Sequence, residues 1–171
     1  WAKLNNLKQA AKTMNFLTEH GISNYGELES KLAALSARRD TAHAEIKRVE
    51  SRSTELALVM KHAGTYRQLK PLYDRYRKSN DKEKFLRGHE SEIILFEAAA
   101  RELKRLGAVP LPTTESMKTE LANLNAEKER LLAEYKTART EAQEYETVKQ
   151  NVDALLAVPK DQEQQRRHEL E

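Results

Sequence analysis

Apolar residues recur every three or four positions along most of the chain, which is the pattern of amphipathic helices with one buried face. Gly21 ends the first such segment, so we expect an N-terminal helix within residues 1–22. Asn24 and Glu27 form a capping-box pattern that predicts the start of the next helix. The apolar stripe of the first helix is formed by Trp1, Leu4, Leu7, Ala11, Met14 and Leu17.

Residues 23–62 are predicted to form a long coiled-coil helix, because their apolar positions alternate steps of four and three over about five heptads. Such a sustained repeat specifies a left-handed supercoil with a partner helix. Arg39 and Ser53 occupy two positions of the repeat and weaken it. The repeat runs through Leu28, Leu32, Leu35, Arg39, Ala42, Ile46, Val49, Ser53, Leu56, Met60 and Ala63.

A second long helix with the same rhythm is predicted over residues 114–158, from Met117 to Leu155. Thr113 or Thr114 suits its N-cap. Pro159 is predicted to end it, which leaves residues 159–171 as a polar tail rich in Gln, Glu and Arg.

The middle of the chain, 63–113, has a different composition. This segment holds five of the ten aromatic residues, three of the five glycines and three of the four prolines. A helix is predicted from Asp81 to Gly107, and the prolines after it predict an extended connector over 108–112. We therefore expect a small helical head.

These elements predict an all-α fold. The arrangement that uses fewest turns is an elongated antiparallel coiled-coil hairpin of residues 23–62 and 114–158. The head at 63–113 would lie at its far end and the N-terminal helix would pack beside its base. A long three-helix bundle is the alternative, with 24–78 up, 81–106 down and 114–158 up. Periodicity alone does not separate the two.

Composition supports long helices with narrow buried stripes. Of the 171 residues, 39% are hydrophobic and 33% charged, which is too little apolar material for a thick core. No apolar run reaches the length of a membrane span. The absence of cysteine excludes a disulfide scaffold, thiolate metal sites and cysteine nucleophiles, and it fits a reducing compartment. Because the chain begins with Trp1 inside a helical pattern, we interpret it as a fragment of a longer protein.

No catalytic constellation is present in the sequence. The five histidines are too far apart to form a two-histidine metal face on one helix, and no glycine-rich phosphate loop or serine elbow occurs. We therefore expect a protein that is not an enzyme, with no metal site and no cofactor.

The net charge of +3 conceals a strongly basic segment. Residues 61–88 contain nine basic and three acidic residues, a net charge of +6, interleaved with tyrosines and Phe85. Cations beside rings suit single-stranded nucleic acid, because cations meet phosphates and rings stack on bases. Helix-spaced rings also suit a small core, and both interpretations stay open. The candidate nucleic-acid-binding residues are Arg67, Lys70, Tyr73, Arg75, Tyr76, Arg77, Lys78, Lys82, Lys84 and Arg87.

Several segments resemble the region behind the nuclease domain of relaxase/mobilization nuclease proteins of bacterial conjugative elements. The resemblance spans about residues 1–156 and rests on the order and spacing of its motifs. They are the run from Trp1 to Leu28, Tyr73-Asp-Arg-Tyr-Arg-Lys, Lys84-Phe-Leu-Arg-Gly-His-Glu-Ser-Glu-Ile, Leu111-Pro-Thr and Asn151-Val-Asp-Ala-Leu-Leu.

The resemblance implies a non-catalytic C-terminal accessory domain of a DNA relaxase in conjugative mobilization, in the bacterial cytoplasm. The family's catalytic tyrosine and histidine cluster would lie upstream, so no catalytic residue is carried over. Single-stranded DNA, relaxosome or secretion-channel proteins and a second copy of the chain are the partners we consider. A coiled-coil spacer or protein-docking module without DNA affinity is the alternative function.

Overall fold

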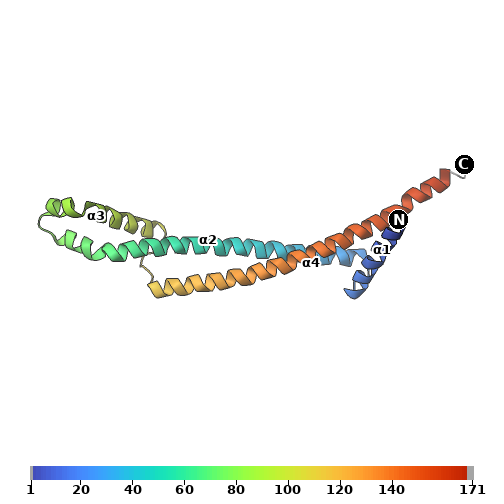
Figure 1. Ribbon diagram of the computed structural model, residues 1–171, viewed down its shortest axis with the longest axis horizontal. Coiled ribbons are helices and arrows are strands. Elements are labelled where there is room, and N and C mark those ends of the chain that lie inside the picture. Colours follow the sequence, from blue (N-terminus) through green and yellow to red (C-terminus); the bar gives the residue numbers. More distant parts are fainter. Residues whose placement is uncertain (1, 169–171) are drawn as a thin grey trace. The chain divides into compact units, whose positions relative to one another are not determined.

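A computed structural model describes residues 2–168, and side chains from residue 5 to residue 157. Over this range the protein consists of four helices and no strand, so the predicted all-α class is confirmed. The helices, labelled in Figure 1, are α1 (Ala2–Glu19), α2 (Tyr25–Lys78), α3 (Lys82–Arg105) and α4 (Thr114–His168). None of the described helices is long and apolar enough to cross a membrane.

The helix ends follow the local signals of the sequence. Gly21 and Gly107 have φ of 64° and 68°, the left-handed conformation that glycine adopts without strain after a helix. The side chain of Asn24 accepts a hydrogen bond from the Glu27 amide at 3.0 Å and caps α2. Asp81 caps α3 and Thr113 caps α4 in the same way. The Val109–Pro110 peptide bond in the connector is cis.

The chain divides into two compact units, Trp1–Ala44 with Leu131–Glu171 and Glu45–Arg130. Both α2 and α4 contribute a segment to each unit. In the first unit, α2 and α4 run antiparallel, because the Tyr25 hydroxyl donates to Asp153 and the Arg38 guanidinium donates to Glu134. Its core joins three buried residues to a half-buried layer: Leu28, Tyr145 and Val148 with Phe16, Leu17, Ile22, Leu32, Leu35 and Val152.

The face of α1 that packs in this unit differs from the predicted apolar stripe. Thr13 is buried and its hydroxyl accepts a hydrogen bond from Asn151 of α4 at 3.2 Å. Phe16 and Leu17 complete the contact, so of the described stripe only Leu17 is packed. Leu7, Ala11 and Met14 are exposed. Trp1 and Leu4 lie outside the described side chains. The prediction was wrong here because a polar pair and two C-terminal residues of α1 fix its orientation.

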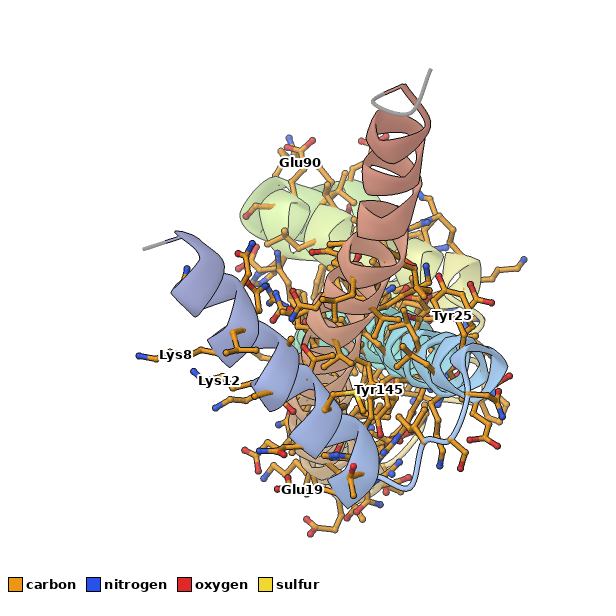
Figure 2. All side chains as sticks on the ribbon, turned by 90° about the vertical axis from the view of Figure 1, so that its right-hand side faces the viewer. Lys8, Lys12, Glu19, Tyr25, Glu90 and Tyr145 are labelled. Carbon is orange, nitrogen blue, oxygen red and sulfur yellow. The ribbon has the colours of Figure 1, made fainter. Side chains whose placement is uncertain are left out.

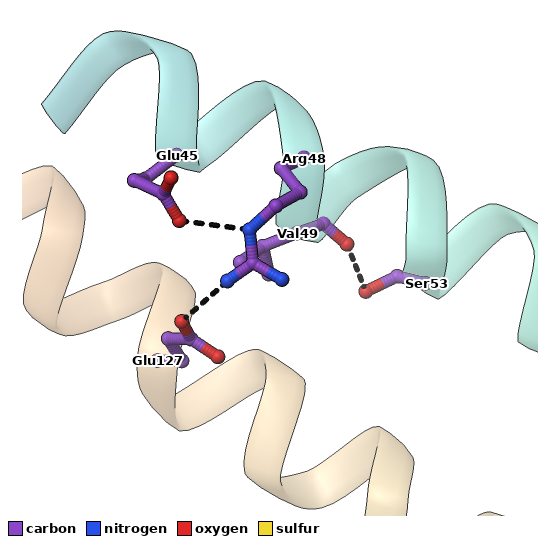
Figure 3. Close-up of polar contacts among 5 residues, drawn as sticks. All are labelled: Glu45, Arg48, Val49, Ser53 and Glu127. Carbon is purple, nitrogen blue, oxygen red and sulfur yellow. Dashed lines mark hydrogen bonds and ion pairs between the residues drawn. The ribbon is translucent and has the colours of Figure 1, made fainter. Parts of the chain in front are cut away.

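In the second unit, α2 and α4 are again antiparallel. Arg48 of α2 donates to Glu127 of α4 at 3.1 Å and also to Glu45 on its own helix at 2.8 Å (Figure 3). Arg52 pairs with Glu120 at 2.7 Å, farther along α2 and nearer the start of α4. The direction of α4 is therefore opposite to that in the three-helix alternative. These partly exposed pairs contribute little free energy each and mainly fix register.

The buried face of this unit lies beneath those ion pairs. Val49 is fully buried, and the hydroxyl of Ser53 donates to the Val49 carbonyl at 2.9 Å (Figure 3). This bond satisfies the polar group that the sequence places in the heptad repeat. Leu124 of α4 and Leu56 of α2 are buried as the repeat predicts. Val59, which the repeat omits, is also buried.

One predicted helix end is wrong, and α2 is longer than the coiled-coil segment 23–62. Helix α2 is continuous through residue 62 and Pro71 to Lys78, so the segment 63–113 begins inside a helix. Rings beyond Pro71 pack on α3, and this packing offsets the backbone hydrogen bond that the proline removes. Helix α4 continues through Pro159 to His168 instead of ending there. Residues 160–168 are rich in Gln, Glu and Arg, which favour helix.

Candidate nucleic-acid interface

The basic segment, residues 61–88, covers the end of α2, the turn after it and the start of α3, all in the second unit. Ser79, Asn80 and Asp81 connect the helices, and the Asp81 side chain accepts a hydrogen bond from the Lys84 amide at 2.9 Å. The turn therefore brings the C-terminal end of α2 next to the N-terminal turns of α3. Basic residues from both helices meet there.

A line of rings joins the two helices behind this turn. Phe96 of α3 is buried and stacks on Tyr73 and Tyr66 of α2, with ring centroids 4.1 and 4.8 Å apart. The line continues from Tyr73 to Tyr76 at 5.9 Å and from Tyr76 to Phe85 at 6.0 Å. These separations are typical of favourable aromatic pairs. Both predicted tyrosines, Tyr73 and Tyr76, are therefore half-buried members of the core between α2 and α3.

The environment of Tyr73 reflects this position. Burial raises the pKa of its hydroxyl, and the nearby Glu97 carboxylate raises it further. The hydroxyl donates to Glu97 of α3 at 3.4 Å. Tyr73 thus ties α2 to α3 through its hydroxyl, and Phe96 stacks on one face of its ring while Tyr76 lies tilted beside it.

Two of the eight predicted cations are engaged within the protein. Arg67 donates to the Thr114 hydroxyl at 2.8 Å and to the Pro112 carbonyl, so it fastens the connector to α2. Lys70 pairs with Asp74 at 2.8 Å. The hydrogen bond from Lys70 lowers the pKa of the Asp74 carboxyl, so this carboxylate stays ionised and offsets the lysine charge. We do not count either cation among those facing a ligand.

The other six cations are exposed, and none of them makes a salt bridge within the part of the chain that the structure describes. We call them the basic turn cluster: Arg75, Arg77, Lys78, Lys82, Lys84 and Arg87. The first three occupy the last turn of α2 and the others the first turns of α3. Arg75 and Lys78 are three positions apart, as are Lys84 and Arg87, so each pair shares a helix face.

A shallow groove lies beside this cluster, with a cavity volume of about 310 Å³. Its lining residues are Ser79, Asp81, Lys84, Phe85, Gly88 and His89. His89 has φ of −143° and ψ of 22°, which interrupts the regular geometry of α3 at this point. The groove thus combines a lysine, a half-buried ring and a hydroxyl beside the cationic surface.

Sequence reasoning identified the cations and Phe85 but missed Ser79 and His89 as groove residues. His89, which lines the groove, is where α3 departs from regular helical geometry, and hydrophobic periodicity carries no signal for such a departure. Among the described residues, no group of three or more His, Asp or Glu side chains is placed to hold a metal ion.

Comparison of the chain with protein-family models, with curated proteins and with solved structures finds no match.

Proposed function

We propose that this protein is a non-catalytic helical module that binds single-stranded nucleic acid through the basic turn cluster. The proposal rests on six exposed cations that make no salt bridge with any described residue. They lie at one turn between two helices that a line of rings holds together. Phosphates are the natural partners of such a surface, because each neutralised phosphate releases condensed counterions. The groove beside Lys84 offers the ring of Phe85 to a base.

The resemblance to relaxase accessory regions supplies a setting for this proposal. In that setting the nucleic acid is the single DNA strand transferred during conjugation, and catalysis belongs to another part of the protein. The DNA strand would lie across the turn between α2 and α3. The cations would contact its phosphates, so binding would show no sequence preference.

A protein-docking role is the second candidate function, and a separate observation favours it. Leu7 and Met14 of α1 are 67% and 60% exposed, although the sequence places them in an apolar stripe. Exposed apolar side chains that gather into one patch mark interaction surfaces, and Leu7 and Met14 lie two turns apart on one helix face.

The proposal is tested by titrating the protein with a fluorescein-labelled 30-nucleotide DNA strand at several salt concentrations. If four or five of the six cations meet phosphates, the log–log slope of affinity against salt is about −3, at about 0.7 per contact. Affinity then falls about 60-fold between 50 and 200 mM salt. A slope near zero, or no binding at 50 mM salt, would refute the proposal and leave the docking role.

A further inference from the structure

The outer face of α1, next to its contact with α4, carries a second apolar surface. Successive residues of a helix are turned by about 100°, which places Leu7, Ala11 and Met14 within a narrow arc. Thr13 and Phe16, which pack on α4, lie well outside that arc. The exposed arc is therefore a true apolar stripe that the first unit leaves uncovered.

This stripe adjoins a small hollow beside α4. Ala10 of α1 and Leu155 of α4 line a cavity of about 130 Å³ with Asn6, Gln9, Asn151 and Ala154. Leu155 is itself 43% exposed. Ala10 lies between the packed face and the stripe, so the apolar surface extends from Met14 and Leu7 toward Leu155. A helix laid along α1 would bury the stripe and place a side chain in this hollow.

The charge beside the stripe selects the partner. Lys8 and Lys12, four positions apart, lie on the side of α1 away from this hollow, Lys8 next to the stripe and Lys12 beside a second hollow that α1 and α4 line together. Figure 2 shows both lysine side chains extending outward from α1. Neither makes a salt bridge within the described part of the chain. Helix α1 holds three lysines and one glutamate, so α1 of a second copy would bring like charges together.

We propose that the outer face of α1, formed by Leu7, Ala11, Met14, Lys8 and Lys12, docks an acidic amphipathic helix of another protein. The partner's apolar side chains cover Leu7 and Met14, as in helix-in-groove recognition. Its flanking glutamates or aspartates pair with Lys8 and Lys12. This site is in the first unit and is separate from the basic turn cluster.

Methionine-methyl NMR tests the proposal, because the chain has only three methionines. The probe is a synthetic three-heptad helix with Leu at its a and d positions and Glu at e and g. We expect the Met14 methyl signal to shift on titration, while the buried Met117 of the second unit stays unchanged. A peptide of the same composition in scrambled order should leave both signals in place.

Variants locate the binding. Leu7→Gln with Met14→Gln should weaken the peptide about tenfold or more, read by fluorescence anisotropy, and Lys8→Glu with Lys12→Glu should do the same. The matched control, Ile94→Gln with Leu95→Gln, changes two similarly exposed residues of α3 and should have no effect. Loss of binding only in the control, or a static Met14 signal, would overturn the proposal. Concentration-dependent dimerisation abolished by the Leu7 and Met14 changes would also overturn it, in favour of a second copy.

Discussion

Replacing Arg75, Arg77 and Lys78 together by glutamate should abolish binding of single-stranded DNA. These residues supply half of the basic turn cluster from the last turn of α2. Removing three phosphate contacts reduces the salt slope by about 2, and the new carboxylates repel the strand. We expect affinity at 50 mM salt to fall about 100-fold or more, measured by anisotropy of labelled DNA.

A charge-matched variant provides the control for this result. Lys31, Lys136 and Arg139 are exposed on the first unit, and their change to glutamate alters the net charge by the same amount. Binding should fall only a few-fold in this control, through the weaker overall field. Equal losses in both variants would show that net charge, and not the turn, governs binding. Glutamine at 75, 77 and 78 should give an intermediate loss while avoiding acidic charge at a helix C-terminus.

The second large effect is expected on stability. Phe96 is 6% exposed and stacks on both Tyr66 and Tyr73, so Phe96→Ala removes the central ring between α2 and α3. Truncating a buried phenylalanine costs about 3–5 kcal/mol, through lost burial and the cavity left behind. Urea denaturation followed by circular dichroism measures this change in the free energy of unfolding.

The neighbouring Ile94 gives the comparison, because it lies on the same helix and is 57% exposed. Ile94→Ala should cost less than about 1 kcal/mol. Phe96→Ala should also weaken DNA binding while leaving the salt slope nearly unchanged. All six cations of the basic turn cluster remain in this variant, but the two helices that carry them are held together less firmly. Equal destabilisation by the two changes would contradict the packing role of the ring line.

The sequence was sufficient for the fold class and for most helix ends. Gly21, Asn24, Asp81, Gly107 and Thr113 act through backbone groups within a few residues, so local chemistry decides them. The buried positions Leu28, Ile46 and Leu124 also follow the heptad repeat, because one narrow stripe is all that a paired helix buries.

Other features depend on contacts between distant segments. Pro71 lies inside α2 because rings on α3 hold the helix beyond it. A rule that considers only the residues next to a proline does not include packing against a distant helix. The face of α1 is set by Thr13 bonding Asn151, which lies 138 residues away. The candidate site was also only partly predictable from the sequence. Its cations were evident from the local composition, but the hydrogen bonds of Arg67 to the connector and the ion pair of Lys70 with Asp74 became visible only in the structure.

Lysine footprinting tests most directly where a nucleic acid lies. The protein is acetylated with a water-soluble ester, with and without saturating single-stranded DNA, and modification rates are read by mass spectrometry. We predict that Lys78, Lys82 and Lys84 are protected several-fold, whereas the exposed Lys31 and Lys136 of the first unit react as before. Uniform protection of all five lysines, or protection confined to Lys31 and Lys136, would contradict binding at the turn between α2 and α3.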